Sequence, residues 1–134
     1  MKQVAQNENS SLQQQTIEEK EKALFEQIHQ MIMDRKLFLD PLFSREKYIK
    51  LGLINKNKVA YLLQRYAKTN LNGYINNLRL DYAIQLMQDN PEAPMKAIAI
   101  DSGFKHIRTF YRQFLARYGV TPSGYKIHYE TTNS

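Results

Sequence analysis

The chain has 134 residues, which is enough for one compact domain or for two very small ones that share a connecting element. Hydrophobic residues make up 43% and charged residues 24%, as in ordinary globular proteins. The lack of cysteine excludes disulfides, thiolate metal sites and cysteine nucleophiles, and it fits a reducing cytoplasm. No apolar run approaches the roughly 20 residues that cross a bilayer, and the first residues lack the apolar stretch of a signal peptide. We therefore expect a cytoplasmic module without membrane contact.

Positive charge is concentrated in the second part of the chain. Residues 1–46 hold eight acidic and six basic side chains, a net of −2, whereas residues 47–134 hold five acidic and thirteen basic, a net of +8. No carboxylate occurs between Lys47 and Leu80 or between Ser102 and Tyr129. Two such stretches predict two positive surfaces, which favour a polyanionic partner. Charge alone leaves open a solvated basic face without any partner.

The first predicted helix follows a polar segment. Residues 1–15 are rich in Gln, Asn and Ser, so we expect a disordered tail or a linker there. Thr16 and Glu19 have the spacing of a capping box, which predicts a helix over about residues 16–34. Its apolar stripe consists of Ile17, Leu24, Ile28, Met31 and Ile32.

Further helical patterns are separated by loops that contain Pro, Gly or Asn. No stretch alternates with period two for long enough to predict a strand, so the expected fold is all-α with about seven helices. The later helices are expected over residues 45–51, from Asn55 through Tyr66, over residues 72–88 and 95–102, around Phe110, Phe114 and Tyr118, and from Pro122 through Tyr129.

An internal repeat relates the two halves of the chain by a shift of 51 residues. Each copy contains a short helix, a Gly-containing turn, and a second helix with polar and basic residues on its outer face, which is the plan of a helix-turn-helix. The glycine is expected to adopt positive φ where the first helix ends. The matching pairs are Gly52-Leu53 with Gly103-Phe104, Val59 with Phe110, Leu63 with Phe114, and Asn72-Gly73-Tyr74 with Ser123-Gly124-Tyr125.

The repeat predicts one domain over residues 16–134, built from two helix-turn-helix units. The first unit covers about residues 16–71, the linker helix about 72–88, and the second unit about 92–129. A linker of about 17 residues spans roughly 26 Å. Together with the widths of the units, this length lets two recognition helices enter successive major grooves, roughly 34 Å apart. One chain would then bind a two-part, non-palindromic site.

The run from about Phe43 to Ile127 resembles the DNA-binding domain of AraC-type transcription factors, the arabinose-operon regulator family. The resemblance implies sequence-specific binding of double-stranded DNA, activation through RNA polymerase, and an N-terminal sensor or signalling domain, which we expect to be missing from this chain. The residues that carry it are Tyr74-Ile75, Leu78-Arg79-Leu80 and Ala83 in the linker, and Ile98-Ala99, Gly103-Phe104, Phe110, Phe114 and Tyr118 through Tyr125 in the second unit.

Two positions depart from the family pattern. Tyr48 stands where the family has a small alanine at the helix crossing, whereas Ala99 keeps the alanine in the second unit. Leu115 takes a place usually held by lysine, which removes one expected contact to the DNA backbone.

The outward faces of the two second helices supply the base-contacting candidates, and their positions match those of the family. Asn and Gln can pair bidentately with adenine, and Arg can pair with guanine. The candidates are Asn55, Asn57, Ala60, Tyr61 and Gln64 in the first unit and Ile107, Arg108, Thr109, Tyr111 and Arg112 in the second.

Basic residues at helix starts and turns are the candidates for phosphate contacts, which position a protein without specifying sequence. Arg79 lies inside the linker pattern, and we expect it to be structural. The aromatic residues Phe104, Phe110 and Phe114 are expected in the core. The phosphate candidates are Lys56, Lys68, Lys105, His106 and Lys126.

We expect no enzyme, no cofactor and no metal. The three histidines fall in separate helices without metal-ligand spacing, and the sequence has neither a phosphate-binding loop nor a nucleophile elbow. Two alternatives remain open: a helical adaptor that binds an acidic protein partner, and a non-specific or RNA-binding module. Indifference to duplex DNA would favour the first, and loss of discrimination between cognate and scrambled duplexes the second.

Overall fold

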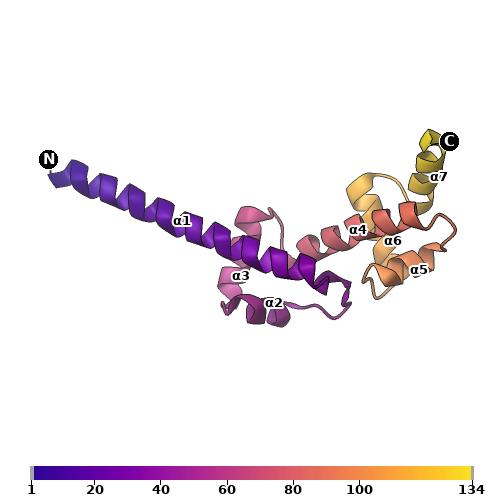
Figure 1. The fold of residues 1–134 in the computed structure, drawn as a ribbon, viewed down its shortest axis with the longest axis horizontal. Coiled ribbons are helices and arrows are strands. Elements are labelled where there is room, and N and C mark those ends of the chain that lie inside the picture. The colour runs from indigo at the N-terminus through magenta and orange to yellow at the C-terminus, as the bar shows by residue number, and fades with distance from the viewer. Residues whose placement is uncertain (1, 134) are drawn as a thin grey trace. The chain divides into compact units, whose positions relative to one another are not determined.

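The structure is a computed structural model that describes the backbone of residues 2–133 and the side chains of residues 10–128. Within this range it contains seven α-helices, one 3-10 helix and no strand (Figure 1), which confirms the predicted all-α fold. The helices are α1 (Lys2–Asp34), η1 (Leu37–Leu39), α2 (Arg45–Gly52), α3 (Lys56–Tyr66), α4 (Leu71–Asp89), α5 (Met95–Asp101), α6 (Ile107–Tyr118) and α7 (Pro122–Asn133).

The chain forms two compact units. The first comprises Met1–Arg35 and Ser44–Leu71, and the second comprises Lys36–Phe43 and Asn72–Ser134. The first unit was expected to cover all of residues 16–71, whereas the segment Lys36–Phe43 groups with the second unit. It belongs to the second unit because Arg79 of α4 holds it by hydrogen bonds to main-chain oxygens.

Helix α1 begins at Lys2, not at Thr16, so the expectation of a disordered tail over residues 1–15 is not met. Thr16 lies within the helix, where its Oγ1 donates to the carbonyl oxygen of Leu12 at 3.0 Å instead of capping an end. Residues 2–34 contain neither Pro nor Gly and many Gln, Glu and Lys, which have favourable helix propensity. The N-terminal part of α1 continues past α2 and α3 (Figure 1).

The first unit is a three-helix packing of α1, α2 and α3. Ile28 and Ile32 of α1 are fully buried, as are Tyr48 of α2 and Leu62 of α3. Tyr48 therefore fills the helix crossing where the family pattern has alanine. Its hydroxyl has no hydrogen-bond partner among the described residues, although it is buried.

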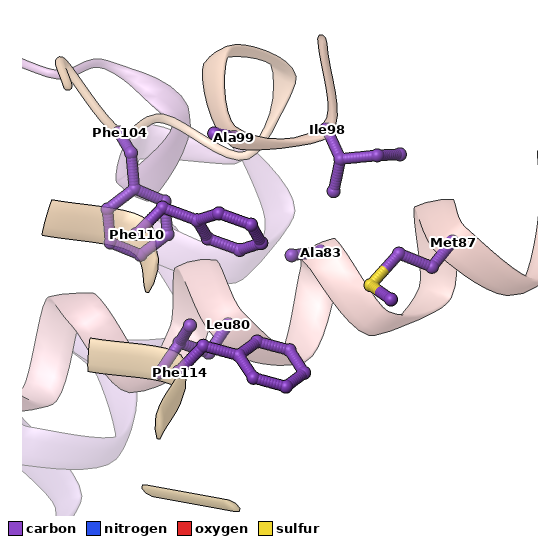
Figure 2. Packing of buried hydrophobic residues seen from close by; sticks show 8 residues of the cluster. All are labelled: Leu80, Ala83, Met87, Ile98, Ala99, Phe104, Phe110 and Phe114. Atoms are coloured by element: carbon purple, nitrogen blue, oxygen red, sulfur yellow. The ribbon is translucent and has the colours of Figure 1, made fainter. Parts of the chain in front are cut away.

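The second unit has a core rich in aromatic residues, drawn in Figure 2, in which side chains of α4, α5 and α6 face one another. Phe110 packs against Phe104 with ring centroids 5.3 Å apart and against Phe114 at 5.7 Å. Ala99, at the helix crossing, is completely buried. The predicted core role of the three phenylalanines is confirmed, and none of them is available to stack on a base.

The two helix-turn-helix units end their first helices in the same way, with one residue in the left-handed region. In the second unit this residue is Gly103, with φ of 95°. In the first it is Leu53, with φ of 51°, and not Gly52 as the sequence repeat predicted. Gly52 has another role, since a Cβ there would lie 2.6 Å from the buried Cδ1 of Ile28.

Hydrogen bonds show why the repeat shifts at this point. The amide of Ile54 donates to the carbonyl oxygen of Ile49 at 3.3 Å, and the amide of Phe104 donates to that of Ala99 at 3.0 Å. Both are the six-residue closure of a Schellman motif, which requires a left-handed residue immediately before the donor. In the register of the repeat, the closing hydrogen bond of α2 lies one residue later than that of α5, so the left-handed position falls on a leucine.

Arg79 fixes the segment that precedes the first helix-turn-helix to α4. Its Nε donates to the carbonyl oxygen of Phe38 at 2.7 Å, and its Nη2 donates to that of Asp40 at 2.9 Å. Burial lowers the pKa of Arg79, while the nearby Asp40 acts in the opposite direction. Gly103 lies against this segment, because a Cβ there would be 2.6 Å from the Phe38 oxygen. The structural role expected for Arg79 is confirmed.

Candidate nucleic-acid interface

Helix α3 is built to expose one polar face. Asn55 caps it, accepting the backbone N–H of Lys58 on Oδ1 at 2.9 Å, so its amide already has a structural role. Val59, Leu62 and Leu63 are buried. The predicted base-contacting residues all lie on the solvent-exposed side: Asn55, Asn57, Ala60, Tyr61 and Gln64.

Helix α6 repeats this arrangement in the second unit. Phe110 and Phe114 are fully buried, and the predicted residues Ile107, Arg108 and Arg112 are exposed. The other two base-contacting candidates, Thr109 and Tyr111, are only partly exposed. The ring of Tyr111 packs edge-on against Phe110 with centroids 5.8 Å apart, so it belongs in part to the core. The outward face of α6 is therefore narrower than the sequence predicted.

The phosphate candidates lie at the predicted helix ends. Lys56 begins α3, and Lys68 follows it with a left-handed φ of 58°. Lys105 and His106 precede α6 and are exposed, and the side chain of His106 makes no capping hydrogen bond. Lys126, in α7, is half-buried. The first four therefore present their side chains to solvent, as a phosphate contact requires.

A hollow of about 580 Å³ lies where α5 meets the start of α6. It brings together five of the predicted residues with two that were not among the candidates, Lys96 and Ile100 of α5. Only the packing of α5 beside α6 unites them, so no spacing in the sequence identified them. The lining residues are Lys96, Ile100, Lys105, His106, Ile107, Arg108 and Thr109.

Some cations of the carboxylate-free stretches are paired by carboxylates from elsewhere in the same unit. Lys58 forms an ion pair with Glu21 of α1, and its Nζ lies 5.3 Å from the ring centroid of Tyr61. Arg65 pairs more loosely with Glu18, at 3.6 Å. The charge count along the sequence missed these pairings and overstates the positive charge offered to a polyanion.

The same applies to Arg117 in the second unit. Its Nη2 lies 2.8 Å from Oδ1 of Asp81, and its Nη1 donates to the carbonyl oxygen of Asn77 at 2.7 Å. Arg117 thus ties α6 to α4. Arg108 and Arg112 remain as the exposed arginines on the outer face of α6.

The described residues also bear on metal binding and on membrane insertion. No group of three or more His, Cys, Asp or Glu side chains there lies close enough to hold a metal ion. None of the helices in that part of the chain combines the length and the apolar character needed to cross a membrane.

A short helix, a tight turn and an exposed polar second helix, present in both units, define a helix-turn-helix DNA-binding domain. Residues 53–127 match the model of a family described as "Helix-turn-helix domain". The chain belongs to this family and to its AraC type, the DNA-binding domain of transcription regulators.

Curated relatives and a solved structure agree with this assignment. Over 102 residues the chain is 28% identical to "XylDLEGF operon transcriptional activator 3" and to "XylDLEGF operon transcriptional activator 1", both of Pseudomonas putida. These matches cover 74% of this chain and 30% of each relative, so the chain spans less than a third of their length. The C-terminal domain of the two-component response regulator yesN from Fusobacterium nucleatum has the same fold, with a TM-score of 0.66, 20% identity, and coverage of 75% of this chain and 95% of that one.

Proposed function

We propose that this DNA-binding domain recognises a two-part duplex site, with α3 and α6 each entering one segment of major groove. The observation that carries the proposal is the shared design of the two helices. Each buries an apolar stripe and exposes polar or cationic side chains at the positions that face outward in a helix-turn-helix. Because both helices belong to one chain, the site needs no two-fold symmetry.

The two helices are proposed to contact bases by different chemistry. In α3, the amides of Asn57 and Gln64 suit adenine, and Tyr61, 44% exposed, offers a ring and a hydroxyl. In α6, the guanidinium groups of Arg108 and Arg112 suit the O6 and N7 atoms of guanine. Asn55, Ala60, Thr109 and Tyr111 complete the two faces.

Phosphate contacts are proposed for the exposed Lys56, Lys68, Lys105 and His106 and for the half-buried Lys126. Contacts of this kind release counterions, so affinity falls as salt rises. We also propose that the complete regulator activates transcription through RNA polymerase, under a sensor or signalling domain, in the bacterial cytoplasm. The relatives named as transcriptional activators, and their greater length, support this part of the proposal.

Selection from a randomised 20-base-pair duplex pool tests the proposal. We expect enrichment of a two-part motif whose halves lie about 10 base pairs apart. Gln64→Ala should lose the preference in one half only, and Arg112→Ala in the other half only. A wild-type pool without any enriched motif, or variants that both affect the same half, would contradict the proposal.

A further inference from the structure

The hollow between α5 and α6 has an apolar feature that a phosphate contact does not explain. Ile100 and Ile107 both line it, and they are 56% and 37% exposed. The rest of the lining is largely cationic, through Lys96, Lys105 and Arg108. The described lining residues include no carboxylate. Two solvent-exposed isoleucines beside three cationic side chains fit a ligand that is both anionic and locally apolar.

Duplex DNA offers one apolar group in its major groove, the C5-methyl of thymine. An isoleucine side chain can neither donate nor accept a hydrogen bond, so it cannot recognise guanine, cytosine or adenine by their polar edges. Ile107 is the first residue of α6, and the first turns of a recognition helix are those that meet base edges. We propose that Ile107, backed by Ile100, selects thymine in the half-site contacted by α6.

In this proposal the cations that line the hollow attract the phosphates of the DNA backbone. Lys96 comes from α5 and Lys105 from the turn before α6, so positive charge flanks the isoleucine pair from two elements. Phosphates attracted to these side chains bring the attached bases towards Ile107. The inference rests on the proposed function, and it adds to that function the identity of one base and the atom that is recognised.

Replacing thymine by deoxyuridine tests the inference, because the change removes only the methyl group. The duplex selected above is resynthesised with one deoxyuridine at a time, and binding to the full chain is measured by fluorescence anisotropy. We expect one position in the α6 half-site where affinity falls about four-fold, the effect of exposing one buried methyl-sized group. For the Ile107→Ala protein, replacing that thymine by deoxyuridine should change affinity by less than about 1.5-fold.

Leu115→Ala is the matched control, since Leu115 is an exposed aliphatic residue of α6, 49% exposed, that does not line the hollow. It should keep the full response to deoxyuridine. Ile107→Gln should shift the preferred base at the sensitive position from thymine to adenine, because an amide pairs with adenine. This second variant provides a gain of binding that a misfolded protein cannot give.

The outcomes separate the two proposals. If a two-part motif is selected but no thymine-to-deoxyuridine change alters the affinity, the inference is overturned and the proposed function stands. The two isoleucines would then belong to a surface for an apolar protein partner. A pool without an enriched motif contradicts the proposed function and removes the inference with it.

Discussion

The residue that closes α2, Leu53, has a strained left-handed backbone, and replacing it should change the free energy of unfolding of the first unit. Leu53 has φ of 51° and is 92% exposed, so its side chain contributes little packing. A left-handed conformation costs an ordinary L-residue about 1–2 kcal/mol, and glycine avoids this cost. Glycine also makes the unfolded chain more flexible, which offsets about 0.4–1 kcal/mol. Leu53→Gly should therefore stabilise the first unit by about 0.5–1 kcal/mol.

Urea denaturation followed by circular dichroism measures this change. With a slope of about 2 kcal/mol per molar urea, the midpoint should rise by about 0.3–0.5 M. Leu53→Ala is the matched control, because it removes the exposed side chain but keeps the strained backbone, and its midpoint should move far less. The reasoning is refuted if Leu53→Gly lowers the midpoint, or if Leu53→Ala raises it equally.

The remaining predictions concern four other side chains. Tyr48→Phe should be neutral or stabilise by up to about 1 kcal/mol in urea denaturation, because it removes a buried hydroxyl without a protein partner; a loss above this size would reveal a missing partner. Burial raises the pKa of Tyr48 to about 12, so the folded state favours the neutral phenol, and stability should hold below pH 10 and fall between pH 10 and 12. Tyr48→Phe should reduce this fall without abolishing it, since the pKa of Tyr118 is also raised to about 12; an unchanged alkaline profile would count against the assignment. Arg79→Ala should destabilise the second unit by about 2–3 kcal/mol in the same assay, because it leaves two main-chain oxygens without a charged donor, and a loss under about 0.5 kcal/mol would show that water replaces it. Arg112→Ala should relax sequence preference in competitive duplex binding, whereas Lys68→Ala should weaken all duplexes alike and reduce the slope of affinity against salt by about one, and equal effects would reject the division between base and phosphate contacts.

Most helix bounds could be predicted because the decisive signals are local. Asn55 caps α3 as its position before an apolar stripe predicted, and Pro122 begins α7 as expected. The buried faces also followed from spacing, since Phe110 and Phe114 are one helical turn apart and both are fully buried. Periodicity along one helix is enough to assign such residues.

The misses have causes that helical periodicity does not contain. The left-handed position fell on Leu53 because the hydrogen bond that closes α2 lies one residue later in the repeat than the one that closes α5, which self-alignment of the sequence does not detect. The pairing of Lys58 with Glu21 needs α1 to pack on α3, over 37 positions of sequence. Tyr111 was assigned to the outward face by helical spacing, but its large ring reaches back to the core. Helical spacing predicts which way a Cβ points, but it does not predict which residues the end of a long side chain contacts.

The chemistry of the two recognition faces also bears on how the domain orients on DNA. On α3 the candidates are neutral amides and a phenol, such as Asn57 and Gln64, whereas α6 combines the aliphatic Ile107 with the cationic Arg108 and Arg112. Neutral amides favour adenine, and the α6 face favours thymine beside guanine. Under the proposed readout the half-sites differ because the arginines of α6 favour guanine, so reversing the domain on its site would mismatch both helices at once. Each mismatch typically costs about 1–3 kcal/mol, so a single bound orientation should dominate by at least about thirty-fold.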